Sequence, residues 1–75
     1  MNIYVVLADD WEGVYTEGTL YDEAHSINWL SFLSEHVGET IESYSEIYIK
    51  SAQWLNEEGG LPFTLEEFKQ KEDIK

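Results

Sequence analysis

The sequence predicts an α+β fold in which a four-stranded mixed sheet carries helices packed on one face. Segments that are apolar or that alternate with a period of two are typical of strands, and they lie at residues 2–8, 12–16, 19–22 and 40–50. Segments with helical spacing or capping residues lie at 27–37, 52–58 and 65–71. The predicted order is therefore βββαβαα, in a chain of 75 residues that has room for a single small domain.

The first three strands are predicted to form a meander. Residues 2–8 are apolar at almost every position, which is typical of a central strand covered on both sides. Between the second and third strands, Gly18 supplies the positive φ that a tight hairpin turn requires. Gly13 is expected to mark a β-bulge or a close approach to the backbone.

The segment 27–37 is predicted to be a helix that Ser26 caps and Gly38 ends. Its apolar stripe recurs at helical spacing and consists of Ile27, Leu30, Leu33 and Val37, widened by Trp29 and Phe32. A right-handed crossover through this helix makes the fourth strand parallel to the first. The spatial order of the strands should then be third, second, first, fourth.

The fourth strand, residues 40–50, alternates between two faces. The face expected to be buried holds Ile41, Ser43, Ser45, Ile47 and Ile49. The opposite face holds Thr40, Glu42, Tyr44, Glu46, Tyr48 and Lys50. Further along, Ser51 is expected to cap the helix at 52–58, and the Thr64–Glu67 capping box opens the last helix with Phe63 and Phe68 as a hydrophobic staple.

Acidic residues dominate the charge of the chain. Sixteen Asp and Glu residues stand against four Lys and no Arg, which gives a formal net charge of -12 at pH 7. Residues 1–49 contain ten of these acids and no Lys or Arg at all. Direct binding to nucleic acid is excluded, because phosphates would be repelled. With no long apolar run, no secretory signal and no cysteine, the sequence predicts a cytoplasmic protein that does not enter a membrane.

The density of this charge is comparable with that of DNA. A domain of this length should be about 30 Å across, and duplex DNA carries about twelve charges in about 20 Å of its axis. A groove lined with Lys and Arg could therefore accept this protein as it accepts a short piece of nucleic acid. The alternative is that the charge only keeps the protein soluble.

Motifs for catalysis or for cofactor binding are not found. The acidic residues around Asp9 and Asp22 suit a hard cation, but they lack the spacing of a calcium loop, and no metal site is assigned. The two histidines, His25 and His36, do not form a metal-binding pair. A chain this short is expected to have little room for a pocket of several hundred Å³. We therefore predict that the protein is not an enzyme and has no cofactor.

Eight residues are predicted to bind a partner protein. On one face of the fourth strand, carboxylates that can pair with Lys or Arg alternate with Tyr rings that can stack on guanidinium groups. These residues are Glu42, Tyr44, Glu46 and Tyr48, and those in the loop after the first strand are Asp9, Asp10, Trp11 and Glu12. Two alternatives remain: the tyrosines pack beneath a terminal helix, and Trp11 closes one end of the core.

In its size, acidity, lack of cysteine and abundance of aromatic residues, the chain resembles the small acidic proteins that phages encode against bacterial defence. These include anti-CRISPR and anti-restriction inhibitors, and no shared motif assigns a role to any residue. The resemblance implies a non-catalytic DNA mimic that blocks the nucleic-acid site of a basic protein, a nuclease or a CRISPR effector, as a monomer or a homodimer. The alternatives are an immunity protein or antitoxin against a basic toxin, a divalent-cation-binding domain and a housekeeping domain.

Overall fold

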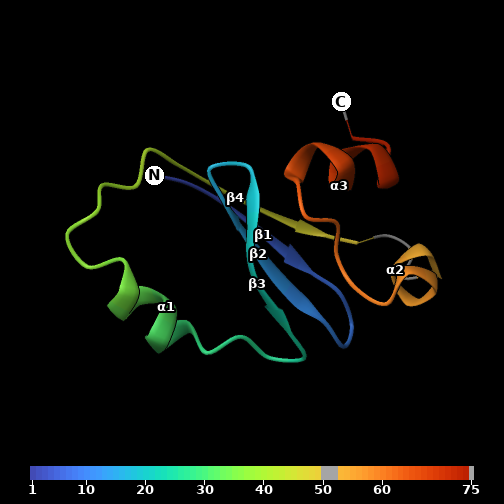
Figure 1. Cartoon of the computed structure of the whole chain (residues 1–75), viewed down its shortest axis with the longest axis horizontal. Helices are drawn as coiled ribbons and strands as arrows, with labels where there is room; N and C mark the ends of the chain where they lie inside the picture. Colours follow the sequence, from blue (N-terminus) through green and yellow to red (C-terminus); the bar gives the residue numbers. More distant parts are fainter. Residues whose placement is uncertain (50–52, 75) are drawn as a thin grey trace.

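The computed structural model describes residues 1–49 and 53–74, and it has an α+β fold with a four-stranded mixed sheet (Figure 1). Its elements are β1 (Asn2–Leu7), β2 (Glu12–Thr16), β3 (Thr19–Ala24), α1 (Trp29–Glu35), β4 (Ser43–Tyr48), α2 (Gln53–Glu58) and α3 (Leu65–Lys71). This order confirms the predicted βββαβαα arrangement. The predicted cap at Ser51 lies outside the described residues.

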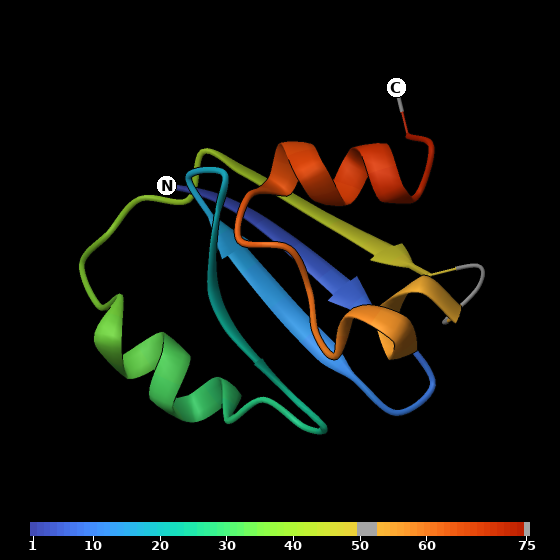
Figure 2. The same cartoon turned by 45° about the vertical axis from the view of Figure 1, so that its right-hand side comes forward.

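The strands lie in the order β3-β2-β1-β4, as predicted (Figure 2). β1 is antiparallel to β2 and parallel to β4. The β2–β3 turn places Glu17 and Gly18 at positive φ values of 52° and 81°, which confirms the role predicted for the glycine. Leu7 pairs with Glu12 on one side and with Tyr48 on the other, so these three side chains share a face of the sheet.

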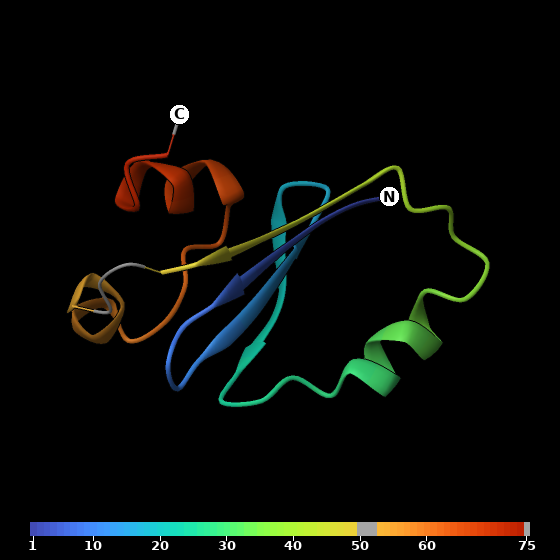
Figure 3. The ribbon, with the colours of Figure 1, turned by 180° about the vertical axis from the view of Figure 1, so that it is seen from behind.

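Helices cover both faces of the sheet, so the prediction that they share one face is wrong. On one face, Ile3, Val5 and Val14 pack with Ile27 and with Phe32 of α1. On the opposite face, Val6 and Tyr15 pack with residues of α2, α3 and the segment between them: Leu55, Leu61 and Phe68. Figure 3 shows α1 and the α2–α3 pair on opposite sides of the sheet. The reason lies in β1, whose apolar residues point to both faces and require cover on each.

The helix α1 is shorter than predicted and is turned differently about its axis. Its N-cap is Asn28 and not Ser26, and the Asn28 side chain accepts a hydrogen bond from the Ser31 N–H. Phe32 is buried, whereas Leu30 and Val37 are 78% and 82% exposed. Of the predicted apolar stripe, Leu30, Leu33 and Val37 therefore face away from the core, whereas Ile27, just before the helix, is buried as predicted. Phe32 lies against the rings of Tyr21, Trp29 and His36 instead, and this aromatic contact sets the face that α1 presents to the sheet.

The segment before α3 ties the helices to the sheet. Thr64 is the predicted N-cap, and its hydroxyl accepts from the Glu67 N–H at 3.2 Å. Phe68 is fully buried beside the rings of Tyr4, Tyr15 and Trp54, while Phe63 is largely exposed. The sheet and α2 therefore bury Phe68. The predicted hydrophobic staple between Phe63 and Phe68 is not formed.

Gly13 lies where another segment approaches the backbone closely. A Cβ atom at this position would be 2.0 Å from Cδ1 of Leu61, so the Leu61 side chain would have to move to admit any residue larger than glycine. The irregularity of the hairpin lies one residue further on, between Val14 and Tyr15, where the register of β2 against β3 shifts. The close approach predicted for Gly13 is therefore confirmed, with the Leu61 side chain as the approaching group.

Candidate partner-binding site

Four residues of the candidate site form a line along β4. The register with β1 places Tyr44, Glu46 and Tyr48 beside Ile3, Val5 and Leu7, on the face of the sheet where α1 lies. Tyr44 and Tyr48 are 56% and 71% exposed. We call this line, together with Glu42 directly before it, the β4 stripe. The alternative that its tyrosines pack beneath a terminal helix is wrong, because α2 and α3 lie on the other face.

The side chains of the β4 stripe contact one another. The Tyr44 hydroxyl donates a hydrogen bond to Oε1 of Glu46 at 2.6 Å. This hydrogen bond is the main reason why the pKa of Tyr44 is raised above its usual value, so the phenol stays a neutral donor. Oε1 of Glu42 lies 3.6 Å from the amino group of Met1. The two carboxylates are therefore held in place at the surface.

The opposite face of β4 is only partly buried, which corrects the prediction of one fully buried face. Ser43 and Ser45 are exposed, and Ile41 precedes the strand and is exposed as well. Ile47 and Ile49 pack against the core beneath α2 and α3. Among the described strands, β4 is the last at its side of the sheet and has a neighbour on one side only, and its first half lies outside the core.

Asp9 and Asp10 lie at the same end of the sheet as Tyr48. Because β1 and β4 are parallel, both strands end there, and the Ile49 N–H donates to the Leu7 carbonyl at 2.8 Å. Both aspartates are exposed. The parallel pairing therefore brings the loop acids and the β4 stripe to neighbouring parts of the surface, although they are far apart in the sequence.

Trp11 and Glu12 have structural partners inside the fold. The Trp11 indole N–H donates to Oε1 of Glu23 at 2.9 Å, and its ring meets His25 edge-on with the centroids 4.9 Å apart. Oε1 of Glu12 accepts from the Ile27 N–H at 2.8 Å. Trp11 thus helps to close one end of the core, and Glu12 fixes the chain where it enters α1. Of the eight predicted residues, the six exposed ones are Asp9, Asp10, Glu42, Tyr44, Glu46 and Tyr48.

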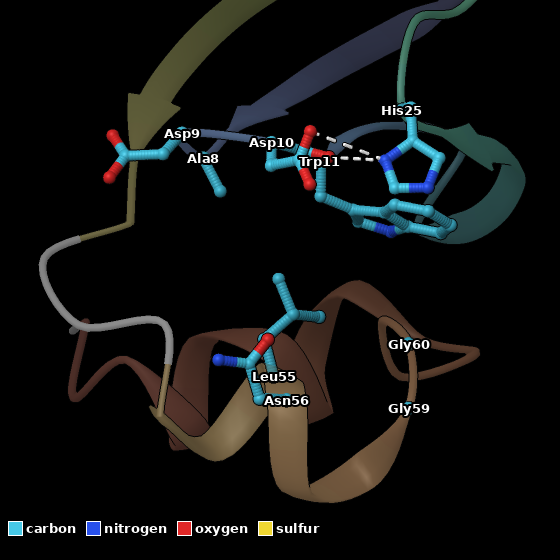
Figure 4. A pocket seen from close by; sticks show the side chains of 9 residues that line it. All are labelled: Ala8, Asp9, Asp10, Trp11, His25, Leu55, Asn56, Gly59 and Gly60. Carbon is cyan, nitrogen blue, oxygen red and sulfur yellow. Dashed lines mark hydrogen bonds and ion pairs between the residues drawn. The ribbon is translucent and has the colours of Figure 1, made fainter.

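A cleft of about 480 Å³ lies between the β1–β2 loop and α2 (Figure 4). Asp9, Asp10 and Trp11 line one side, and Leu55 projects from α2 on the other. The expectation that so small a domain has little room for a pocket of this size is wrong, since the β1–β2 loop and α2 leave one between them. No motif in the sequence links α2 to the loop, so its contribution to this site was not predicted.

His25 is the titratable ring in this cleft. Its Nδ1 donates to the carbonyl oxygen of Asp10 at 2.9 Å and lies 3.4 Å from Oδ1 of the same residue (Figure 4). Among the described residues, those that line the cleft include no serine, threonine, cysteine or lysine. Within residues 1–49 and 53–74, no group of three or more His, Cys, Asp or Glu residues is arranged to hold a metal ion.

The two lysines of α3 lie away from the β4 stripe, while Lys50 and Lys75 lie outside the described residues. Nζ of Lys69 lies 5.5 Å from the centroid of the Tyr4 ring, and Lys71 forms an ion pair with Glu58. Both lysines belong to α3, which packs on the opposite face of the sheet. Residues 1–49 contain no Lys or Arg, and the positive group that the structure places beside the stripe is the amino group of Met1, 3.6 Å from Oε1 of Glu42.

No family model, curated protein or solved structure matches this chain. None of the helices in the described part of the chain has the length and apolarity required to cross a bilayer. The function of the protein is therefore inferred from the geometry and charge of its own surface.

Proposed function

We propose that this protein is a non-catalytic inhibitor that occupies the nucleic-acid site of a basic protein, a nuclease or a CRISPR effector. The observation that carries the proposal is the β4 stripe, in which exposed carboxylates alternate with exposed tyrosines. Its acidic neighbours Asp9 and Asp10 extend it at the end of the sheet. In a phage-infected cell, such an inhibitor would act in the host cytoplasm.

The separation of charge in the fold supports this proposal. The lysines of α3 lie on one face of the sheet, and the β4 stripe lies on the other. A predominantly negative surface attracts a cationic groove over a distance of about one Debye length and so speeds the first encounter. Tyr44 and Tyr48 then supply rigid ring surface that can stack on Arg side chains and slow dissociation.

Reversing the charge of the stripe tests the proposal. The double variant Glu42→Lys with Glu46→Lys should lose binding to the basic partner, because both carboxylates are replaced by repulsive charges. Both positions are exposed, and the change at Glu42 also removes its ion pair with the Met1 amino group, so urea unfolding is used to check that the fold survives. A matched control changes the net charge equally at Glu35 and Glu57, which are exposed near the ends of α1 and α2, where lysine is favourable.

The measurement uses the natural host extract and then the purified partner. A tagged protein captures its partner at graded salt, the captured protein is identified, and its binding to duplex DNA is titrated with each variant. Wild type and the Glu35→Lys, Glu57→Lys control should displace the DNA, and the stripe variant should not. If the stripe variant displaces the DNA as well as wild type does, the β4 stripe is not the partner-binding site. Capture of a basic toxin that does not bind nucleic acid would favour the immunity protein instead.

A further inference from the structure

The two edges of the sheet are treated differently by the fold. At the β3 edge, the chain before α3 runs alongside: Thr19 forms a bridge with Thr64, and the Leu20 N–H donates to the Phe63 carbonyl at 2.8 Å. At the β4 edge, no described strand pairs with the outer side. One edge is therefore covered by the chain itself, and the other is open.

The open edge lacks several of the features that block strand pairing at the edge of a sheet. β4 has six residues without proline, glycine or lysine. Its register with β1 runs without a shift from Asn2↔Ser43 to Leu7↔Tyr48, so no bulge twists the edge away. Soluble proteins normally protect such an edge, since its free N–H and C=O groups can pair with another chain. An edge of this kind is suited to receive an added strand.

Charge decides which strand would fit. An added strand would lie about 4.8 Å from β4, and its alternate side chains would stand opposite Glu42, Tyr44, Glu46 and Tyr48. Lys or Arg at every second position would meet a carboxylate or a tyrosine ring each time. A second copy of this chain would instead bring another acidic stripe to the same edge, with a net charge of -12 on each copy.

We propose that β4 binds an extended basic segment of the partner as a fifth strand of the sheet. This inference rests on the proposed function and specifies how the partner is recognised. Backbone hydrogen bonds along β4 would supply affinity, and Glu42 and Glu46 would select strands with alternating basic residues. In such a strand-addition site, the β4 stripe supplies the side-chain contacts and the β4 backbone supplies the hydrogen bonds.

Two synthetic peptides of equal charge test the inference. One alternates lysine and threonine over about eight residues, which matches the length of a typical strand. The other alternates lysine and proline over the same length, and proline removes the donors and the geometry that strand pairing needs. Each is titrated into the isotope-labelled protein, and amide shifts and hydrogen exchange are followed by NMR.

The lysine–threonine peptide should bind at least about tenfold more tightly than the lysine–proline peptide, because several backbone hydrogen bonds are gained. Amide exchange in β4 should slow in its presence, while exchange in the covered β3 should not change. Replacing Glu42 and Glu46 by Gln keeps the side-chain shape and should weaken the lysine–threonine peptide about tenfold or more.

Other results would distinguish failure of the strand-addition site from failure of the proposed charge-based inhibition. If both peptides bind equally well, and the Glu42→Lys, Glu46→Lys variant binds neither, strand addition is overturned. The proposal that the acidic surface binds a basic partner is then retained. If neither peptide binds even at low salt, the strand-addition site is overturned and the proposed charge-based recognition fails with it. If the β4 amides are protected without peptide and sedimentation shows a dimer, a second copy of the chain occupies the edge. That result overturns the proposal that a basic strand binds there.

Discussion

Individual carboxylates in this acidic chain have different roles. Glu12 and Glu23 accept hydrogen bonds from the Ile27 and Leu61 N–H groups, each at 2.8 Å, and Glu23 also accepts from the Trp11 indole. Hydrogen bonds to a charged group contribute about 1.5–3 kcal/mol each. These two acids therefore hold segments of the chain together, whereas Glu42 and Glu46 are exposed at the surface.

Gly13 gives a prediction about packing. Gly13→Ala should lower the free energy of unfolding by about 1–3 kcal/mol, because the new methyl group would overlap Leu61. In a Leu61→Ala background the same substitution should cost much less, since the overlapping atoms are gone. Urea unfolding of the four proteins measures this coupling. If Gly13→Ala costs the same in both backgrounds, contact with Leu61 is not the reason for the glycine.

Tyr15 gives a prediction about pH. Its hydroxyl donates to the Pro62 carbonyl at 2.7 Å, and burial, followed by the charges of Glu23 and Glu67, raises the pKa of Tyr15. In the unfolded chain the phenol ionises near its usual pKa of about 10, while in the folded chain it stays protonated. Its contribution to stability is thus complete below about pH 10 and falls as the pH rises further.

Tyr15→Phe should therefore lose less stability between about pH 9 and about pH 11 than wild type, by about 1 kcal/mol. Urea unfolding at both pH values provides the measurement. The pKa of Tyr4 is also raised, mainly by burial, so some alkaline loss should remain in the variant. An equal loss in the two proteins would mean that Tyr15 ionises as readily in the folded state as in the unfolded state.

Among the elements, α1 has the least expected arrangement. Its aromatic residues face the sheet, and Leu30, Leu33 and Val37 remain exposed. Two apolar stripes compete on this helix, and their spacing alone does not decide between them. The ring contacts of Phe32 with Tyr21 and His36 decide it, and Tyr21 lies on another element, in β3.

Substitutions in α1 distinguish the two stripes. Leu30→Gln with Leu33→Gln should change the free energy of unfolding by less than about 0.5 kcal/mol, because both residues are exposed and glutamine is a good helix former. Phe32→Ala should cost about 3–5 kcal/mol, since Phe32 is buried. Chemical denaturation of both variants tests this. A large loss in the double glutamine variant would show that the leucine stripe is the one that packs.

The strands were the part of the fold that the sequence predicted best. Alternation and β-forming residues located all four strands, and the single crossover predicted the parallel pairing of β1 with β4. Alternation also showed that Glu42, Tyr44, Glu46 and Tyr48 share a face, but a period of two does not reveal which face is covered. That depends on where α1, α2 and α3 pack, and their positions depend on long-range contacts.

The same limit applies to Glu12 of the candidate site and to Glu23, which was not among the predicted site residues. Glu12 and Glu23 look like surface acids in the sequence, because no local pattern indicates a partner. Their partners, the N–H groups of Ile27 and Leu61, are 15 and 38 residues away along the chain. The cleft beside Trp11 was hidden for the same reason, since α2 forms its other side.

At the scale of the whole molecule, the charges are close together. The described residues extend over 37 × 26 × 17 Å, so many pairs of carboxylates lie within the Debye length of about 30 Å that applies at 0.01 M salt. Their repulsion opposes the compact state more than the unfolded chain, in which the same charges are further apart. Small domains have a low free energy of unfolding, so this repulsion should have a measurable effect on the stability of the fold.

Added sodium chloride should therefore stabilise the folded protein. Between about 10 mM and about 0.5 M salt, the melting temperature should rise by about 5 °C or more, since about 1 kcal/mol corresponds to about 4–8 °C at this size. Circular dichroism at low protein concentration provides the measurement. The Glu35→Lys, Glu57→Lys control carries less negative charge and should show a smaller rise. If salt leaves both melting temperatures unchanged, the carboxylates are too well separated to form a concentrated field, and long-range attraction to a cationic groove would lose its physical basis.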